Sequence, residues 1–118
     1  MNKSIQEKKY IEYATIHRQA SDEGNYRIAN RAYRELSNIY HNISRDKQYA
    51  ELFLKDMLQS ENIGVQLWAA THSLGLQVNL STAVETLEAI SRMEKIGIIK
   101  LSAEMTLKQW KNSKLIVM

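Results

Sequence analysis

The chain has 118 residues, 44% of them apolar, with no cysteine, no proline and four glycines; this predicts one all-α domain over residues 1–118 and excludes disulfides, thiolate metal sites and thiol nucleophiles. The formal net charge of +3 divides into +2 for residues 1–59 and +1 for residues 60–118, so neither half has the clustered basic surface typical of nucleic-acid binders. No apolar run approaches the roughly 20 residues of a membrane span, and the N-terminal segment lacks the apolar core of a signal peptide, so we expect a cytoplasmic protein without membrane contact.

The first helix is predicted over about residues 4–22. Ser4 is a helix-capping residue, and Glu7 three positions later completes a capping box. Gly24 is expected to end this segment, and Asn25 can cap the next helix. The apolar residues that fall near one face at 100° per residue are Ile5, Tyr13, Ile16 and Ala20.

The second helix, over about residues 26–43, has the clearest period in the chain. A wide apolar stripe opposite a polar face is typical of a surface helix. The stripe consists of Ile28, Ala29, Ala32, Tyr33, Leu36, Ile39, Tyr40 and Ile43. The polar face consists of Arg27, Asn30, Arg31, Arg34, Ser37, Asn38 and His41.

A short turn over residues 44–46 is expected to cap a third helix over about residues 47–59. The apolar residues of that helix are Tyr49, Ala50, Leu52, Phe53, Leu54, Met57 and Leu58. The fourth helix, over about residues 63–76, differs because it is apolar on two sides, which predicts that it packs between two neighbours. One side carries Val65, Trp68, Ala69 and Leu76, and the other carries Leu67, Ala70 and Leu74.

Two further helices are predicted towards the end of the chain. Asn79 or Ser81 is expected to start the fifth helix, over about residues 82–93, with Ala83, Val84, Leu87 and Ile90 facing inward. The sixth, over about residues 98–111, carries Ile98, Leu101, Ala103, Met105, Leu107 and Trp110. The final residues, "LIVM", are compatible with a short extended tail.

One phrase of the sequence occurs twice in altered form. Residues 63–74 read "IGVQLWAATHSL" and residues 96–107 read "IGIIKLSAEMTL", so the two copies are related by a 33-residue shift. The same shift places Leu54 on Leu87 and Met57 on Ile90. In both units the glycine is expected to end the bend between two helices, where a β-carbon would crowd the backbone.

A period of roughly 20–50 residues is typical of stacked helical repeats, in which one unit cannot cover its own apolar face. We therefore predict a six-helix right-handed α–α superhelix, a HEAT- or armadillo-like stack of helix pairs over about residues 4–43, 47–76 and 82–111. Helix pairs three–four and five–six should then superpose. The alternative is an irregular six-helix bundle whose two similar hairpins match by coincidence.

Three stretches carry a resemblance to known proteins: "ANRAY" at residues 29–33, "WAATH" at residues 68–72 and "AEMTLKQW" at residues 103–110. They resemble HEAT-like repeats and, more closely, an uncharacterised bacterial family of small helical-repeat proteins known only as a domain of unknown function. The resemblance extends over about residues 5–112. It implies the fold but no activity, although some small HEAT-like bacterial proteins of this kind are suspected immunity proteins encoded beside toxins. Gln66 departs from the family, which usually has a basic residue there, so the resemblance does not carry over a contact made by that residue.

The chain offers little for catalysis. No two of its three histidines stand at i,i+3 or i,i+4, and none of the common phosphate-binding or nucleophile motifs occurs. Glu104 lies at i+4 from Lys100 and at i−4 from Lys108, a surface charge pattern. We interpret His72 as a histidine partly buried between helices, and the two tryptophans as core rather than ligand-stacking residues. No catalytic residue, metal site or cofactor is therefore predicted.

Arg27, Arg31 and Arg34 form the strongest polar cluster, at i, i+4 and i+7 on the second helix. Their face is either simply solvated or a docking surface for an acidic protein or for phosphates. Asn38 and His41 lie beside the arginines. In two-helix stacks the second helix of each unit tends to line the concave side, so the surface would also include Gln66, Ser73, Glu104 and Thr106. We therefore predict a non-enzymatic protein-binding module whose partner is another protein, in its most specific form a toxin-neutralising immunity-type protein. The alternative is a nucleic-acid-binding HEAT-like protein that uses the basic face of the second helix.

Overall fold

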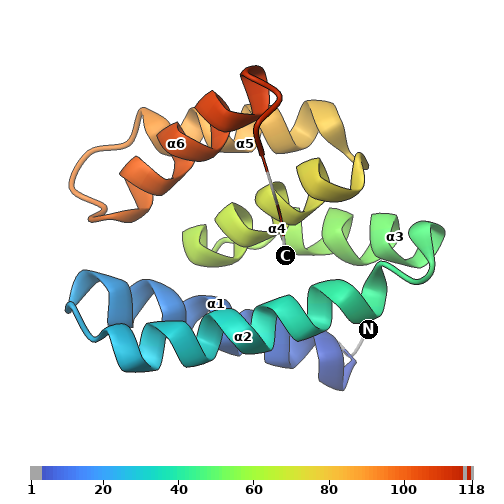
Figure 1. Ribbon diagram of the computed structural model, residues 1–118, viewed down its shortest axis with the longest axis horizontal. Coiled ribbons are helices and arrows are strands. Elements are labelled where there is room, and N and C mark those ends of the chain that lie inside the picture. Colours follow the sequence, from blue (N-terminus) through green and yellow to red (C-terminus); the bar gives the residue numbers. More distant parts are fainter. Residues whose placement is uncertain (1–3, 116, 118) are drawn as a thin grey trace.

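Six α-helices make up the part of the chain that the structure, a computed structural model, describes, namely residues 4–115 and 117. Consecutive helices pack as pairs, and Figure 1 shows the pairs as three layers with α1 and α2 below, α3 and α4 in the middle and α5 and α6 above. The radius of gyration is 13.2 Å, about the value of a compact domain of this length. The predicted all-α fold with packed adjacent pairs is confirmed. The helices are α1 (Ile5–Asp22), α2 (Tyr26–Ile43), α3 (Lys47–Leu58), α4 (Ile63–Leu76), α5 (Leu80–Ser91) and α6 (Ile99–Lys111).

Polar side chains start most of these helices where the sequence predicts. The Glu7 backbone N–H donates to Ser4 Oγ and the Ser4 N–H donates to Glu7 Oε1, both at 3.1 Å, which confirms the capping box. Asn25 caps α2 as expected. Asn79, one of the two residues expected to start the fifth helix, is the N-cap of α5 in a left-handed conformation, and its side-chain amide donates to the Glu51 carbonyl. The helix therefore begins at Leu80, two residues before the predicted start.

The buried face of α1 differs from the prediction. Ile5 is 74% exposed, whereas Tyr10 and Ala14 are fully buried. The reason is that α1 packs against α4 as well as α2. Its Ala14 carbonyl oxygen lies 3.1 Å from the position that a β-carbon at Gly64 would occupy. The face towards α4 was missed because a period shows which residues are apolar but not how many neighbours a helix has.

The helix α4 forms the centre of the molecule, between the α1–α2 and α5–α6 layers (Figure 1). Its two-sided burial is confirmed, because side chains all around it are shielded from solvent. They are Val65, Leu67, Ala69, Ala70, His72, Ser73 and Leu74.

The repeat is regular in the first helix of each unit. The 33-residue shift of α3 gives the bounds of α5, and the pairs Ala50/Ala83, Leu54/Leu87 and Met57/Ile90 are all fully buried. It is less regular in the second helix. The 33-residue shift of α4 would start the sixth helix at residue 96, whereas α6 starts at Ile99. Gly64 lies inside α4, whereas Gly97 precedes α6 with a φ of +82°. The prediction that both glycines end the same bend is wrong.

The segment before α6 is held by the first helix of the chain. Asp22 Oδ1 accepts a 3.0 Å hydrogen bond from the Ile98 backbone N–H, and Arg18 donates to the Ile96 carbonyl at 3.4 Å. A β-carbon at Gly97 would lie 2.5 Å from Asp22 Oδ1, so only glycine allows this approach. In an open solenoid each unit contacts only its neighbours. Here the first pair also contacts the third, and the chain closes on itself at this end.

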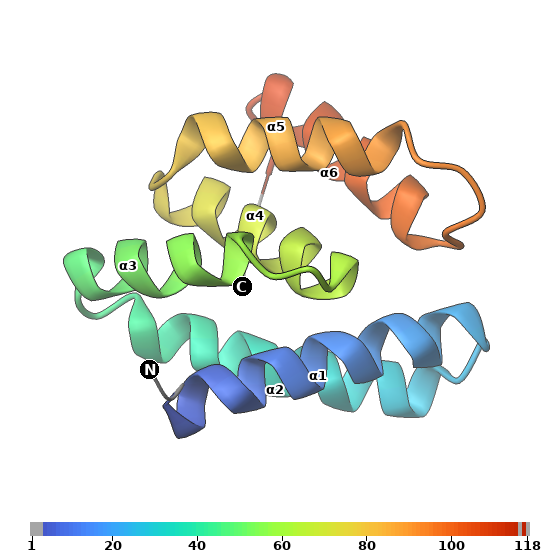
Figure 2. The same cartoon turned by 180° about the vertical axis from the view of Figure 1, so that it is seen from behind.

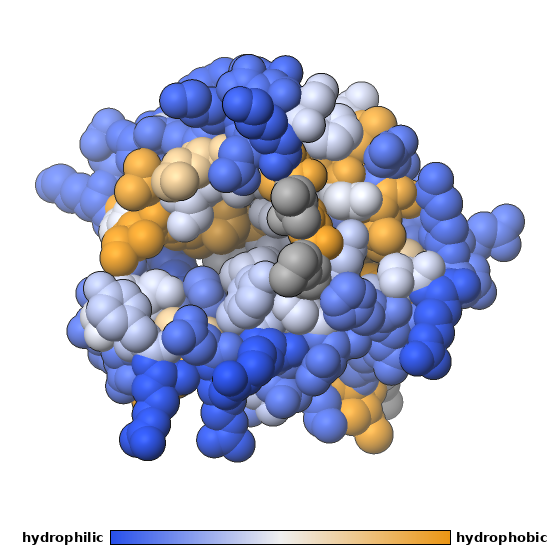
Figure 3. Space-filling view, in the orientation of Figure 1, coloured by the Kyte–Doolittle hydropathy of each residue, from blue (hydrophilic) through white to orange (hydrophobic). Residues whose placement is uncertain are grey.

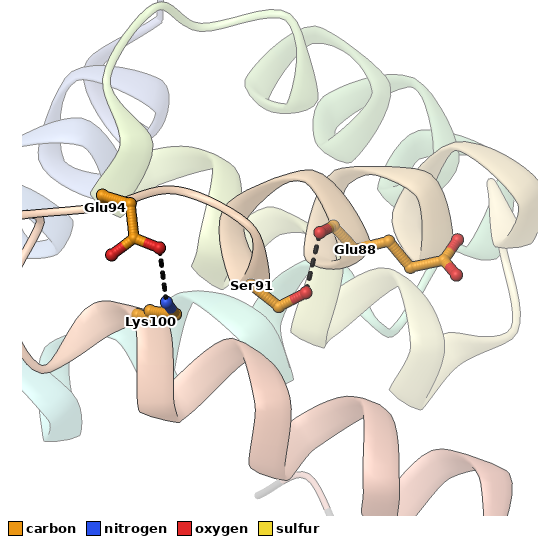
Figure 4. Close-up of polar contacts among 4 residues, drawn as sticks. All are labelled: Glu88, Ser91, Glu94 and Lys100. Atoms are coloured by element: carbon orange, nitrogen blue, oxygen red, sulfur yellow. Dashed lines mark hydrogen bonds and ion pairs between the residues drawn. The ribbon is translucent and has the colours of Figure 1, made fainter.

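Local polar contacts complete the turn between α5 and α6 (Figure 4). Ser91 Oγ donates to the Glu88 carbonyl at 2.7 Å, and Lys100 Nζ lies 3.4 Å from Glu94 Oε1. The Glu94 side chain is largely exposed, and surface ion pairs of this kind contribute only about 0–1 kcal/mol. The turn is therefore fixed mainly by the backbone contacts to α1.

Several apolar residues of the predicted third and sixth helices are exposed. Leu52 of α3 is 68% exposed, and three residues at and within the start of α6 are about half exposed: Ile98 (48%), Leu101 (56%) and Met105 (51%). Among the described residues, no helix is both long and apolar enough to cross a lipid bilayer.

Candidate partner-binding surface

The second helices of the three pairs share one face of the molecule. In Figure 1 the viewer looks onto α2, α4 and α6, while the view from behind in Figure 2 shows α1, α3 and α5 in front. Figure 3 shows that the first of these faces is hollowed between its upper and lower parts. Hydrophobic surface borders the hollow above, where α6 lies (Figures 1 and 3). We call this depression the α2–α4–α6 hollow.

The floor of the hollow is α4, whose Trp68 and Gly75 lie two turns apart on one side of the helix. The Trp68 ring contacts the rings of His17 at 5.0 Å and Tyr33 at 5.8 Å between centroids. Trp68 is thus held from α1 and from α2, and it is only partly shielded from solvent. Its interpretation as a packed residue is consistent with these contacts.

Beneath this floor lies a buried histidine. His72 is 1% exposed, its Nδ1 atom lies 2.7 Å from Tyr10 Oη in a hydrogen bond, and the Tyr40 ring stacks on it at 4.5 Å. Burial, and secondarily the charge of His41, lowers the pKa of His72 from 6.5 to about 3. The imidazole is therefore neutral at physiological pH and closed off from solutes, which confirms the prediction of a histidine between helices.

The upper wall of the hollow is α6. The 33-residue shift places Leu101 at the position of Trp68 and Met105 at that of His72. In α4 these positions are covered by aromatic side chains of α1 and α2, whereas Leu101 and Met105 are more than half exposed. Leu101 and Met105 are one turn apart and lie on the same side of α6. The helix that borders the hollow therefore carries exposed apolar side chains.

The predicted arginine stripe lies elsewhere. Arg27, Arg31 and Arg34 are exposed, and none of them forms an ion pair within residues 4–115 and 117. At 100° per residue they point roughly 100° or more away from Tyr33 and Tyr40, which face α4. The stripe and the hollow are thus separate surfaces. Asn38 and His41, both exposed, accompany the stripe.

The remaining predicted site residues do not join the stripe. Ser73 is fully buried and its hydroxyl has no hydrogen-bond partner within the described chain, so its assignment to a docking surface is wrong. Gln66 is half-buried and donates to the Ser60 carbonyl at 2.6 Å. Both lie roughly 140–180° around α4 from Trp68 and Gly75, where the helix contacts its other neighbours. Glu104 is exposed on α6. The composite polar surface is therefore not formed.

A separate cleft opens between α1, α4 and α6. Burial lowers the pKa of His17, one of its lining residues. Nothing in the sequence indicates this cleft, because its walls come from segments that are far apart in the chain. Its lining residues include His17, Ser21, Trp68, Ile98 and Ser102. The carboxylate and guanidinium at its edge, Asp22 and Arg18, already bind the α5–α6 backbone. Within the described chain, no three His, Asp or Glu side chains gather as a metal site would require.

No protein-family model, curated protein or solved structure matches the chain.

Proposed function

We propose that the protein is a non-enzymatic protein-binding module whose partner docks in the α2–α4–α6 hollow. One observation carries the proposal. Leu101 and Met105 are exposed on α6, while the equivalent positions of α4, Trp68 and His72, are covered by aromatic side chains of the preceding layer. Contiguous exposed apolar surface rimmed by polar residues is typical of protein interaction sites. An apolar segment of a partner would supply the missing cover.

The finer architecture is part of the same proposal. The coincidence of α3 with α5 under the 33-residue shift supports a right-handed α–α superhelix of the HEAT type. The motif resemblance supports membership of the uncharacterised bacterial helical-repeat family. Toxin neutralisation is the most specific form of the proposal, and its support is that resemblance alone.

The test is capture of proteins from the source organism by the immobilised full chain and by two matched variants. Leu101→Asp with Met105→Asp places two charges in the hollow, whereas Ile5→Asp with Leu52→Asp places two charges at sites of greater exposure on α1 and α3. A partner that uses the hollow is expected to be retained by the parent chain and the control, and reduced at least tenfold (about 1.4 kcal/mol) on the Leu101/Met105 variant. Equal retention by all three proteins would contradict the proposal. Circular dichroism checks that both variants fold.

The alternative function, nucleic-acid binding, is favoured by the three exposed guanidinium groups of the stripe. Its signature would be a log–log slope of affinity against salt of about −2 to −3, for three phosphate contacts. We expect no binding tighter than about 1 μM to labelled duplex or single-stranded oligonucleotides at physiological salt. Tighter binding that Arg31→Glu abolishes would place nucleic acid ahead of protein as the partner.

A further inference from the structure

The chain places one of its own side chains on the floor of the hollow. Val117 is half-buried against Gly75 of α4, and a β-carbon at Gly75 would lie 2.9 Å from both Val117 Cβ and Val117 Cγ2. Leu115, two positions earlier, packs against the hydrophobic core. Of the tail that the sequence predicts over residues 115–118, only Leu115 and Val117 lie within the described residues, and Val117 contacts the second-helix face.

Gly75 makes this contact sterically feasible. The same added β-carbon would lie 2.7 Å from Tyr40 Oη, closer than real β-carbons approach another heavy atom. Gly75 is helical and has an ordinary negative φ, so backbone conformation does not require glycine at this position. The missing side chain instead leaves a notch bounded by Tyr40 and filled by Val117.

The turn after α6 sends the chain back towards this notch. Ser113 adopts a left-handed conformation with φ +56°. The Lys114 N–H donates to the Gln109 carbonyl and the Ser113 N–H to the Trp110 carbonyl, the paired bonds of a Schellman motif. Such a motif ends the helix and reverses the chain direction, although glycine is the usual residue at its left-handed position. The contact between Val117 and Gly75 therefore depends on the turn at Ser113 as well as on the absence of a side chain at Gly75.

We propose that the notch at Gly75 and Tyr40 is a binding site for an aliphatic side chain of an extended segment, and that Val117 of this chain is its intramolecular occupant. An apolar segment of a protein partner that enters the hollow takes the same notch and displaces Val117. The displacement rests on the proposed function, whereas the intramolecular contact does not. The tail thereby competes with the partner for one end of the hollow.

The contact is tested by thiol reactivity, because the chain has no cysteine of its own. Single-cysteine variants Val117→Cys and Lys114→Cys are compared; Lys114 is exposed and belongs to the same segment. We expect the thiol at position 117 to react with Ellman's reagent at least tenfold more slowly than the thiol at position 114. Equal rates would overturn the proposal, and this comparison needs no further substitution.

Filling the notch gives the second arm. Gly75→Val introduced into both variants is expected to raise the rate at position 117 to that at position 114 and to leave position 114 unchanged. Gly75→Ala serves the same purpose if valine prevents folding. Continued slow reaction at position 117 in a folded, filled variant would show that another surface protects it, against the proposal.

The displacement is tested with a labelled synthetic peptide of residues 111–118, added in trans. It is expected to bind full-length Val117→Asp, whose own tail is repelled from the notch, at least tenfold more tightly than the parent chain. Equal affinities would show that the tail and an added segment do not compete for the notch. The intramolecular contact and the docking of a partner elsewhere in the hollow are tested separately, by the thiol and capture experiments.

Discussion

Replacement of Trp68 by alanine is expected to lower the free energy of unfolding by about 3 kcal/mol, the lower end of the range for large aromatic side chains in protein cores. The lower end applies because Trp68 is only partly shielded. Its ring nevertheless contacts His17 and Tyr33 from two other helices, as well as His72 on α4 itself. Each aromatic pair contributes roughly 0.5–1.5 kcal/mol beyond the buried area.

The measurement is urea unfolding followed by far-UV circular dichroism, since removal of a tryptophan changes the fluorescence signal itself. Trp68→Phe is the matched control, because it retains an aromatic ring at the junction and should recover a large part of the lost stability. If Trp68→Ala unfolds at the same urea concentration as the parent, the ring contributes no packing and lies free on the surface of the hollow.

Acidification is expected to destabilise the fold through His72. Its pKa is 6.5 in the unfolded chain and about 3 in the folded protein, because of burial. Below about pH 6.5 the unfolded state therefore binds a proton that the folded state does not, and stability falls as the pH falls. The loss approaches about 1.4 kcal/mol per pH unit and amounts to roughly 3 kcal/mol by pH 4. Above the unfolded pKa this contribution is fully present and constant.

A comparison with His72→Asn isolates this effect, because asparagine offers Tyr10 a hydrogen-bond partner near the position of Nδ1 but does not titrate. The free energy of unfolding is measured between about pH 7 and pH 4 for both proteins. His17, whose pKa burial also lowers, is present in both and drops out of the difference. Parallel pH profiles for the two proteins would mean that His72 is accessible to protons in the folded state.

The sequence predicts local structure well where a helix has one apolar stripe. The predicted bounds of α2 and α4 coincide with the observed bounds, because each rests on periodicity within one segment. The 33-residue shift of α3 also gives the bounds of α5. Prediction fails where a helix has an unforeseen neighbour or lacks an expected one. Thus Tyr10 was missed on the second face of α1, and the apolar character of Leu101 did not indicate that it would be exposed.

The candidate site was only partly predictable for the same reason. The second helices were expected to line one side of the molecule, and Figure 1 shows them on one face. The exposure of the three arginines was also expected, because they lie on the polar side of α2. The burial of Ser73 depends on helices packed against both sides of α4. The contact between Gly75 and Val117 joins two distant parts of the sequence through a turn at Ser113 with no glycine to signal it.

Docking of a partner in the hollow is tested most directly by hydrogen–deuterium exchange of the full chain, free and in complex with a protein partner captured from the source organism. A partner in the α2–α4–α6 hollow is predicted to slow amide exchange in residues 99–106 of α6 and residues 67–76 of α4. Exchange in α3 and α5, on the opposite face (Figure 2), should stay unchanged. Protection confined to α1, α3 and α5, with α4 and α6 unaffected, would contradict the account.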